Sequence, residues 1–212
     1  VKTGEFPVVF EAPLAGGLLG SLVHAASGGA LYRKASFLLD QLGKPVMPSF
    51  VNIVERPHLP GGLGSSAFDN DGVATRDRDV VRGGILQGYF LSAYTARKLG
   101  MQTTANAGGS HNLIIEPGEH DLAGLLARMG RGLLVTELLG HGINYVTGDY
   151  SRGAAGFWVE NGQIVHPVEE ITIAGNLRNM LAGIVAVGND VQIRGTKQTG
   201  SIMIDRMTIA GE

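Results

Sequence analysis

The stretch Phe157-Trp158-Val159-Glu160-Asn161-Gly162-Gln163-Ile164-Val165-His166 carries the clearest structural signal in the chain. Two short runs, Phe157–Glu160 and Gln163–His166, flank the pair Asn161-Gly162. A type I′ turn favours this pair, because both of its central residues need positive φ angles. Gly156–Pro167 is therefore predicted to be a β-hairpin, which makes antiparallel pairing a feature of the fold.

Apolar runs bounded by turn residues continue this pattern on both sides of the hairpin. They predict strands over Gly132–Thr136, Val168–Ala174, Ser201–Asp205, Met207–Ala210, Ser49–Glu55 and His111–Ile115, and two more within Val73–Phe90 around Arg82-Gly83-Gly84.

Four segments show helical features, with apolar spacing in three of them and a cap and stop signal in the fourth. They are Gly17–Ser27, Ser92 (as N-cap) to Leu99, the segment between Asp121 and Gly130, and the segment from Asn176 (as N-cap) through Val185, stopped by Gly188. Strands outnumber helices, so we expect an α+β fold with a mostly antiparallel sheet, sandwich or barrel-like, and about four helices. Without a linker-like run or a repeat, 1–212 is predicted to be a single domain.

The composition narrows the functional classes. Of 212 residues, 44% are hydrophobic and 17% charged, and the 33 glycines lack the Gly-X-Y period of collagen. The net charge is −2 without any block of like charge, which argues against direct nucleic-acid binding. The lack of cysteine excludes disulfides, thiolate nucleophiles and cysteine-containing zinc sites, and it fits a cytoplasmic protein.

The segment Ala12–Tyr32 has no Asp, Glu, Lys or Arg, but its glycines, serines and Pro13 make it too polar for a membrane span. No basic region followed by an apolar core marks a signal peptide. A chain that begins with Val1 is expected to be a fragment or a processed product.

Common catalytic patterns are weak in this sequence. No two of the six histidines lie at i and i+4 on one helix, and Glu116, Glu119 and His120 surround a Pro-Gly turn that favours a solvated loop. The glycine-rich segment Gly61–Ser66 lacks the lysine of a P-loop, and no G-x-S-x-G motif exists.

A dense polar cluster lies at Gly148-Asp149-Tyr150-Ser151-Arg152-Gly153, between two apolar stretches. Polar groups in a glycine-rich loop often line a site, because the backbone can approach a ligand closely. They equally often only satisfy one another. The residues alone leave both interpretations open and support only a soluble α+β domain.

Longer motifs resemble the PmbA (TldE) branch of the TldD/PmbA family, also called modulator of DNA gyrase. The motifs are TELLGHGINYVTGDYSRGA at 136–154, GFWVENG at 156–162, GSSAFD at 64–69 with Gly72, ITIAGNL at 171–177 and GND at 188–190. The resemblance covers essentially the whole chain. It implies a C-terminal domain, because full-length members have an additional N-terminal domain, which we expect to be absent from 1–212.

The resemblance implies metal-dependent proteolysis and peptide maturation, but also a degenerate zinc site. In the TldD branch a helix carries H-E-x-x-x-H, with two zinc-binding histidines and a glutamate base, and a distant cysteine completes the metal site. The matching positions here are His24, Ala25 and Gly29. We therefore expect no zinc, no cofactor and no catalytic residue in this chain. A histidine pair with this spacing can converge only where the helix bulges or unwinds.

The resemblance further implies pairing with a zinc-bearing TldD-type relative, or with a second copy, around a cavity that takes unfolded peptide. This chain would supply a cavity wall and a dimer surface, and a sheet edge would hold extended peptide through its backbone. The loop Asn144–Arg152 and the turn Ser65–Asp69 are the expected cavity-facing segments. The candidate residues are Ser65, Ser66, Asp69, Asn144, Thr147, Asp149, Tyr150, Ser151 and Arg152.

Two other functions stay open at this point. One is a self-sufficient hydrolase that uses another metal or a serine. The other is a binding protein that modulates DNA gyrase, as the family's older name suggests, although the sequence shows no acidic stripe or basic patch for it.

Overall fold

The structure is a computed structural model that describes residues 2–211. Two compact units are present, and each is described by itself. The first takes in the chain up to Gly17, Pro117–Gln192 and the chain from Thr199 onward, and the second takes in Leu18–Glu116 and Ile193–Gln198. That 1–212 behaves as one domain stays a prediction.

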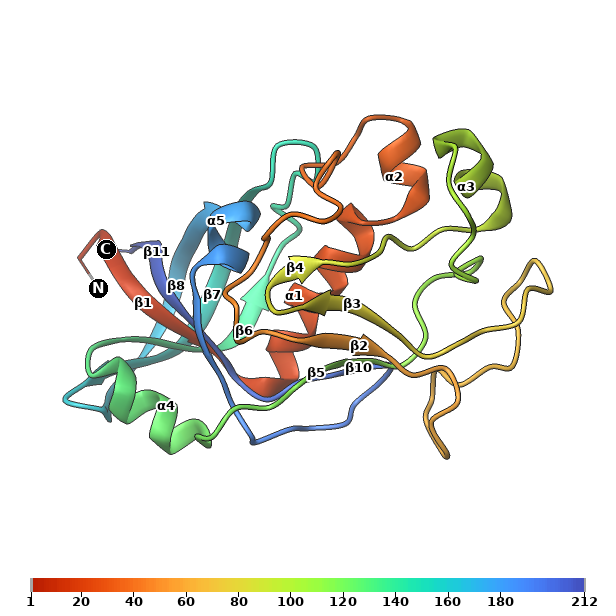
Figure 1. The fold of residues 1–212 in the computed structure, drawn as a ribbon. Coiled ribbons are helices and arrows are strands. Elements are labelled where there is room, and N and C mark those ends of the chain that lie inside the picture. The colour runs from red at the N-terminus through yellow and green to blue at the C-terminus, as the bar shows by residue number, and fades with distance from the viewer. Residues whose placement is uncertain (1, 212) are drawn as a thin grey trace. The chain divides into compact units, whose positions relative to one another are not determined.

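The first unit is built on a sheet that closes on itself. Its elements are β1 (Gly4–Phe10), the start of α1 (Ala12–Ala25), α4 (Leu122–Met129), β6 (Gly132–Leu139), β7 (Asp149–Glu160), β8 (Gln163–Asn176), α5 (Leu177–Ala182), β9 (Ile184–Val187) and β11 (Ile202–Ala210). The strand order is β1-β6-β7-β8-β11-β9, and β1 also pairs with β11 (Figure 1). These pairings make β1, β6, β7, β8 and β11 a small barrel.

The hairpin that dominates the sequence is confirmed as the β7–β8 pair. Asn161 and Gly162 have φ angles of 51° and 74°, as a type I′ turn requires. Pairing runs from Glu160 opposite Gln163 to Asp149 opposite Asn176, so both strands are longer than predicted.

Helix α4 covers one face of this sheet, and the barrel interior lies on the other face. The cluster under α4 comprises Leu125, Leu126 and Met129 of the helix with Val9, Leu134, Val159, Ala186 and Met203 of the strands. Successive strand residues face opposite ways. The interior face is therefore that of Val8, Phe10, Leu133 and Val135, all 0% exposed.

The second unit holds the rest of α1 and a smaller sheet. Its elements are α2 (Gly28–Tyr32), β2 (Ile53–Glu55), β3 (Arg78–Arg82), β4 (Ile85–Leu86), α3 (Ala93–Leu99), β5 (Leu113–Ile115) and β10 (Lys197–Gln198). The strand order is β10-β5-β2-β3-β4, and only the β10–β5 pair is parallel. Strands β3 and β4 flank Gly83 and Gly84, as predicted, and Ser92 caps α3 in a capping box.

Several predicted elements differ in extent. The predicted helix through Val185 is wrong beyond Ala182, because Gly183 caps α5 and Ile184–Val187 pairs with β11 as β9. Helix α1 begins at Ala12, five residues before its predicted start, and the two predicted C-terminal strands are one strand, β11. Strand β1 and helix α2 were not expected.

The fold class is confirmed as α+β with mostly antiparallel pairing. In residues 2–211, no helix has the length and apolar character needed to cross a membrane.

Candidate functional site

The helix that would carry a zinc motif is interrupted. Helix α1 ends at Ala25, and Ser27 is the N-cap of α2, with its side chain accepting from Ala30 N. The unwinding that a converging histidine pair requires is thus present. His24 is exposed, whereas Ala25 is completely buried.

The residues at this break do not fit zinc. A Cβ added at Gly29 would lie 3.5 Å from an Arg33 guanidinium nitrogen, so a cation occupies the region where a second ligand would project. Throughout residues 2–211, no group of three or more His, Cys, Asp or Glu side chains is placed to hold a metal ion. A single imidazole is far short of the four ligands typical of zinc.

The turn Ser65–Asp69 uses its polar side chains internally. Ser65 Oγ donates to Leu59 O at 2.6 Å and accepts from Asn112 Nδ2 at 2.8 Å. Ser66 Oγ donates to the Phe68 carbonyl. The expectation that these hydroxyls face a cavity therefore gains no support from their hydrogen bonds.

Asp69 organises the loop that follows this turn. Its buried carboxylate accepts from Asp71 N and Val73 N at 2.9 Å and from Ala107 N at 3.0 Å. Burial acts to raise the pKa of Asp69, but these backbone donors, with the charge of His111, lower it below the usual value. The neighbouring Asp71 accepts from Ala93 N at 2.8 Å, which joins the loop to α3.

The candidates between Asn144 and Arg152 are brought together in the first unit. Asn144 to Gly148 form a loop, but Asp149–Arg152 are the first residues of β7, so the prediction of a loop there is wrong. Pairing with β8, from Asp149 opposite Asn176 onward, extends the strand. Ser151 N also donates to Gly142 O at 2.7 Å.

Hydrogen bonds fix the geometry of this loop. Asp149 Oδ2 accepts from Thr147 Oγ1 at 2.7 Å, and its Oδ1 accepts from Asn176 Nδ2 at 3.1 Å. These two donors, in that order, lower the pKa of Asp149. Asn144 Oδ1 accepts from Val146 N at 3.0 Å. Much of the cluster therefore satisfies itself, as one of the two interpretations anticipated.

Tyr150 and Arg152 are the exception. The Tyr150 hydroxyl and the Arg152 Nε are buried and form no hydrogen bond within residues 2–211. Burial raises the pKa of Tyr150, and the nearby Arg152 guanidinium opposes part of that rise through its charge and its N–H donors, although the Tyr150 hydroxyl does not meet the geometry of a hydrogen bond with it.

Within residues 2–211, the outer edge of β6 has no strand partner after Val135, and this open edge belongs to the same unit as the loop. Strand β1 pairs with β6 only from Leu133 to Val135, whereas β7 pairs with it as far as Leu139. An irregularity at Thr136 marks the point where the β1 pairing stops. Glu137 and Leu139 are exposed there. Unpaired strand edges of this kind accept an additional strand.

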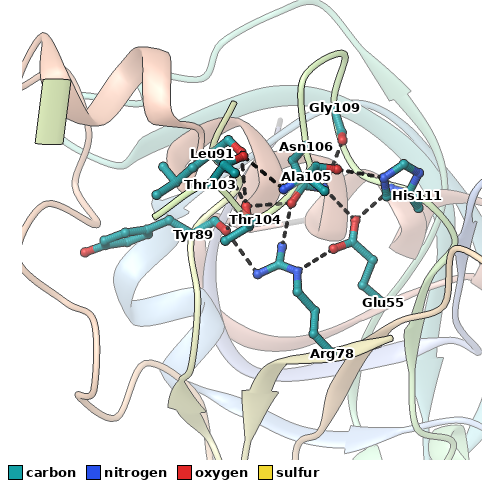
Figure 2. A network of polar contacts seen from close by, with 10 residues as sticks. All are labelled: Glu55, Arg78, Tyr89, Leu91, Thr103, Thr104, Ala105, Asn106, Gly109 and His111. Atoms are coloured by element: carbon teal, nitrogen blue, oxygen red, sulfur yellow. Dashed lines mark hydrogen bonds and ion pairs between the residues drawn. The ribbon is translucent and has the colours of Figure 1, made fainter. Parts of the chain in front are cut away.

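One buried polar network, centred on Glu55 and Arg78, has no counterpart among the predicted site residues. Glu55, only 1% exposed, accepts from Arg78 Nε at 2.6 Å, from Asn106 Nδ2 at 2.9 Å and from His111 N at 2.7 Å (Figure 2). Arg78 also donates to Tyr89 O at 3.0 Å. The network ties β2 and β3 to the segments around Tyr89 and Asn106. The signal for it was a charged residue, Glu55, at the end of the predicted strand Ser49–Glu55.

The candidates fall into two groups. His24, Ala25, Gly29, Ser65, Ser66 and Asp69 belong to the second unit, and Asn144, Thr147, Asp149, Tyr150, Ser151 and Arg152 to the first.

Comparison with known proteins finds similarity to one family of metallopeptidases. The family described as PmbA/TldA metallopeptidase C-terminal domain matches residues 3–211. The chain is 53% identical to a metalloprotease PmbA homolog of Haemophilus influenzae and 51% identical to metalloprotease PmbA of Escherichia coli O157:H7, covering 100% of this chain and 47% of each relative. It thus spans about half the length of these relatives.

Solved structures share the fold. A protein of Bacteroides thetaiotaomicron proposed to be a modulator of DNA gyrase matches with a TM-score of 0.95 and 34% identity, over 100% of this chain and 48% of its own. TldE from Thermococcus kodakarensis matches with a TM-score of 0.87 and 26% identity, over 100% of this chain and 51% of its own.

Proposed function

This chain belongs to the PmbA/TldA metallopeptidase family, and from that membership we propose that it is the subunit of a TldD/PmbA-type metalloprotease that lacks the zinc motif. In this proposal it contributes a wall of the peptide cavity and a surface for pairing. Zinc is held by a TldD-type partner, and the assembly acts on unfolded peptides in the cytoplasm, in proteolysis and peptide maturation.

One observation carries the proposal. At the end of α1, a fully buried Ala25 stands where the family's glutamate base would lie, and Gly29 with the nearby Arg33 stands in place of the second histidine. This segment offers neither a metal site nor a general base. In this proposal, the reacting groups of the proteolytic step therefore come from another chain.

The open edge of β6 supports the peptide-binding role. A strand edge binds extended peptide through backbone hydrogen bonds, which are the same for every sequence. That property suits an enzyme for unfolded peptides, whose side chains vary. The exposed Leu139 beside this edge adds an apolar contact.

The decisive experiment uses the full-length protein and its zinc-bearing relative. We expect the two to co-purify and to cleave an unfolded peptide only together, with zinc bound to the relative alone. Stoichiometric zinc on this protein, or chelator-sensitive cleavage by it alone, would identify a self-sufficient peptidase instead. Gyrase captured by this protein without peptide cleavage by the pair would favour the binding-protein alternative.

A second experiment addresses the cavity wall. Asp149→Ala in the full-length assembly removes the acceptor that holds Thr147 and Asn176, so peptide turnover should fall. Unchanged turnover with lowered stability would mean that this loop has only a structural role.

A further inference from the structure

Two polar atoms on β7 lack the partner that buried polar groups normally have. Tyr150 is 3% exposed, and its hydroxyl makes no hydrogen bond within residues 2–211; the same holds for the buried Arg152 Nε. About nine in ten buried polar groups in proteins are paired with protein or ordered water. Two unpaired atoms two residues apart therefore mark a place on β7 where a group from outside the chain can bind.

Both side chains are on the interior face of the barrel. The side chains of β7 point alternately to the two faces of the sheet along the whole strand. This alternation is not interrupted, because the extra residues at the register shifts belong to β6 and β8. Val159 packs under α4, on the outer face. Tyr150 and Arg152 differ from it by an odd number of residues, so they lie on the opposite face.

The charge of Arg152 is not balanced within the described chain. None of the ion pairs among residues 2–211 includes Arg152, although its Nε is buried. A guanidinium bonds carboxylates through two parallel N–H groups, and these bonds are stronger than those between neutral groups. A tyrosine phenol is protonated at neutral pH, and burial raises the pKa of Tyr150 further, so its hydroxyl is available as a second donor.

These donors lie at the end of the open β6 edge. The last β6–β7 pair joins Leu139 to Gly153, the residue after Arg152. A peptide added to the free edge would lie about 4.8 Å beyond β6, with β7 at a similar distance on the other side. A long arginine side chain and a carboxylate on the peptide can together span that separation.

We propose that Tyr150 and Arg152 form a subsite for a carboxylate of the peptide that lies along β6. The carboxylate belongs to the C-terminus of the peptide or to an acidic side chain. This inference rests on the proposed function and extends it, because the backbone edge supplies general affinity and the subsite supplies a preference for acid.

The test uses the full-length protein paired with its zinc-bearing relative and four versions of one unfolded peptide. Two versions differ only in a free or an amidated C-terminus, and two differ only in a Glu or a Gln near the cleavage site. We expect kcat/KM to be about 10-fold higher for one acid version than for its neutral counterpart. A difference between the free and amidated peptides assigns the carboxylate to the C-terminus, and a difference between the Glu and Gln peptides assigns it to an acidic side chain.

Variants assign the preference to this site. Arg152→Gln should abolish the preference by lowering kcat/KM for the acid peptide alone, and Arg152→Lys should retain part of it. Tyr150→Phe, which removes one oxygen atom, should reduce it by a few-fold. Arg206→Gln, which removes an exposed positive charge elsewhere in the same unit, should leave it intact.

The possible failures are distinguishable. Equal turnover of acid and neutral peptides by the wild-type pair overturns the carboxylate subsite alone. A preference that survives in both Arg152→Gln and Tyr150→Phe also overturns it, and ordered water would then satisfy the two atoms. Absence of any turnover by the wild-type pair overturns the proposed function itself.

Discussion

Arg78 Nε lies 2.6 Å from Glu55 Oε2, with side chains only 11% and 1% exposed. The second carboxylate oxygen, Oε1, accepts from Asn106 Nδ2 and His111 N, so both oxygens are satisfied. The Arg78 guanidinium also lies over the Phe90 ring, 4.9 Å from its centroid. This pair holds distant segments of the second unit together, because the pair and its partners come from four parts of the chain, at Glu55, Arg78, 89–90 and 106–111.

Glu55→Gln should lower the free energy of unfolding by about 3–5 kcal/mol, because it leaves the Arg78 charge buried without a counter-ion. Urea unfolding measures the loss. The matched control is Asp79→Asn, which breaks the pair with Arg82 on the same sheet, where the side chains are 40% and 45% exposed. That change should cost no more than about 1 kcal/mol. Equal losses in the two variants would contradict a special role for the buried pair.

The adjacent residues Gly28 and Gly29 should respond differently to alanine. At Gly28 a Cβ would lie 2.3 Å from Thr95 Oγ1, so α2 and α3 must separate, at a cost of about 1–3 kcal/mol. At Gly29 a Cβ would contact only the flexible end of Arg33, at 3.5 Å, and alanine should gain up to about 1 kcal/mol in helix propensity. Thermal unfolding of both variants compares them. A stable Gly28→Ala would show that the α2–α3 contact is loose.

Local signals in the sequence were sufficient to predict most of the helices and strands. The Asn161-Gly162 turn, the Asp121 and Ser92 caps and the glycine pair between β3 and β4 all depend on neighbouring residues, and the structure has them as predicted. Ile184 and Val185 continue the spacing of the helical stripe, but they form β9. Their conformation is set by the pairing of β9 with β11, in which Ile184 lies opposite Ile204 and Ala186 lies opposite Met203, both distant in sequence.

The candidate site also combines features that depend on neighbouring residues with features that depend on residues distant in sequence. The polar cluster around Asp149 was visible in the sequence, as was the absence of an H-E-x-x-x-H pattern at His24, Ala25 and Gly29. Which cluster members satisfy one another was not, because Asn176 reaches Asp149 only through strand pairing. The open edge of β6 was likewise invisible, since it depends on where β1 stops pairing.

Asp69 should make stability depend on pH in the acid range. Its folded-state pKa lies below its ordinary value of 3.8, so its contribution is present above that value and is lost as pH falls through the lowered pKa. Asp69→Asn places an amide against a backbone donor and should cost about 1–3 kcal/mol at pH 7. Urea unfolding from pH 7 to pH 2 should show the wild type converging toward the variant. A constant difference across this range would exclude the carboxylate as the cause.

Gly162 should tolerate alanine less well than other glycines with positive φ. Its φ of 74° already disfavours a side chain, and an added Cβ would lie 2.8 Å from Ala127 Cα, a backbone atom that cannot yield easily. Gly140 is the control that separates the cost of the backbone conformation from the cost of the steric contact. Its φ is 75°, but nothing lies within 4 Å of an added Cβ. Gly140→Ala should lose about 1 kcal/mol from conformation alone, and Gly162→Ala clearly more. Urea unfolding with an unchanged m-value would assign both losses to the native state. Equal losses would mean that the hairpin turn is not held tightly against α4, and that the turn alone fixes the β7–β8 register.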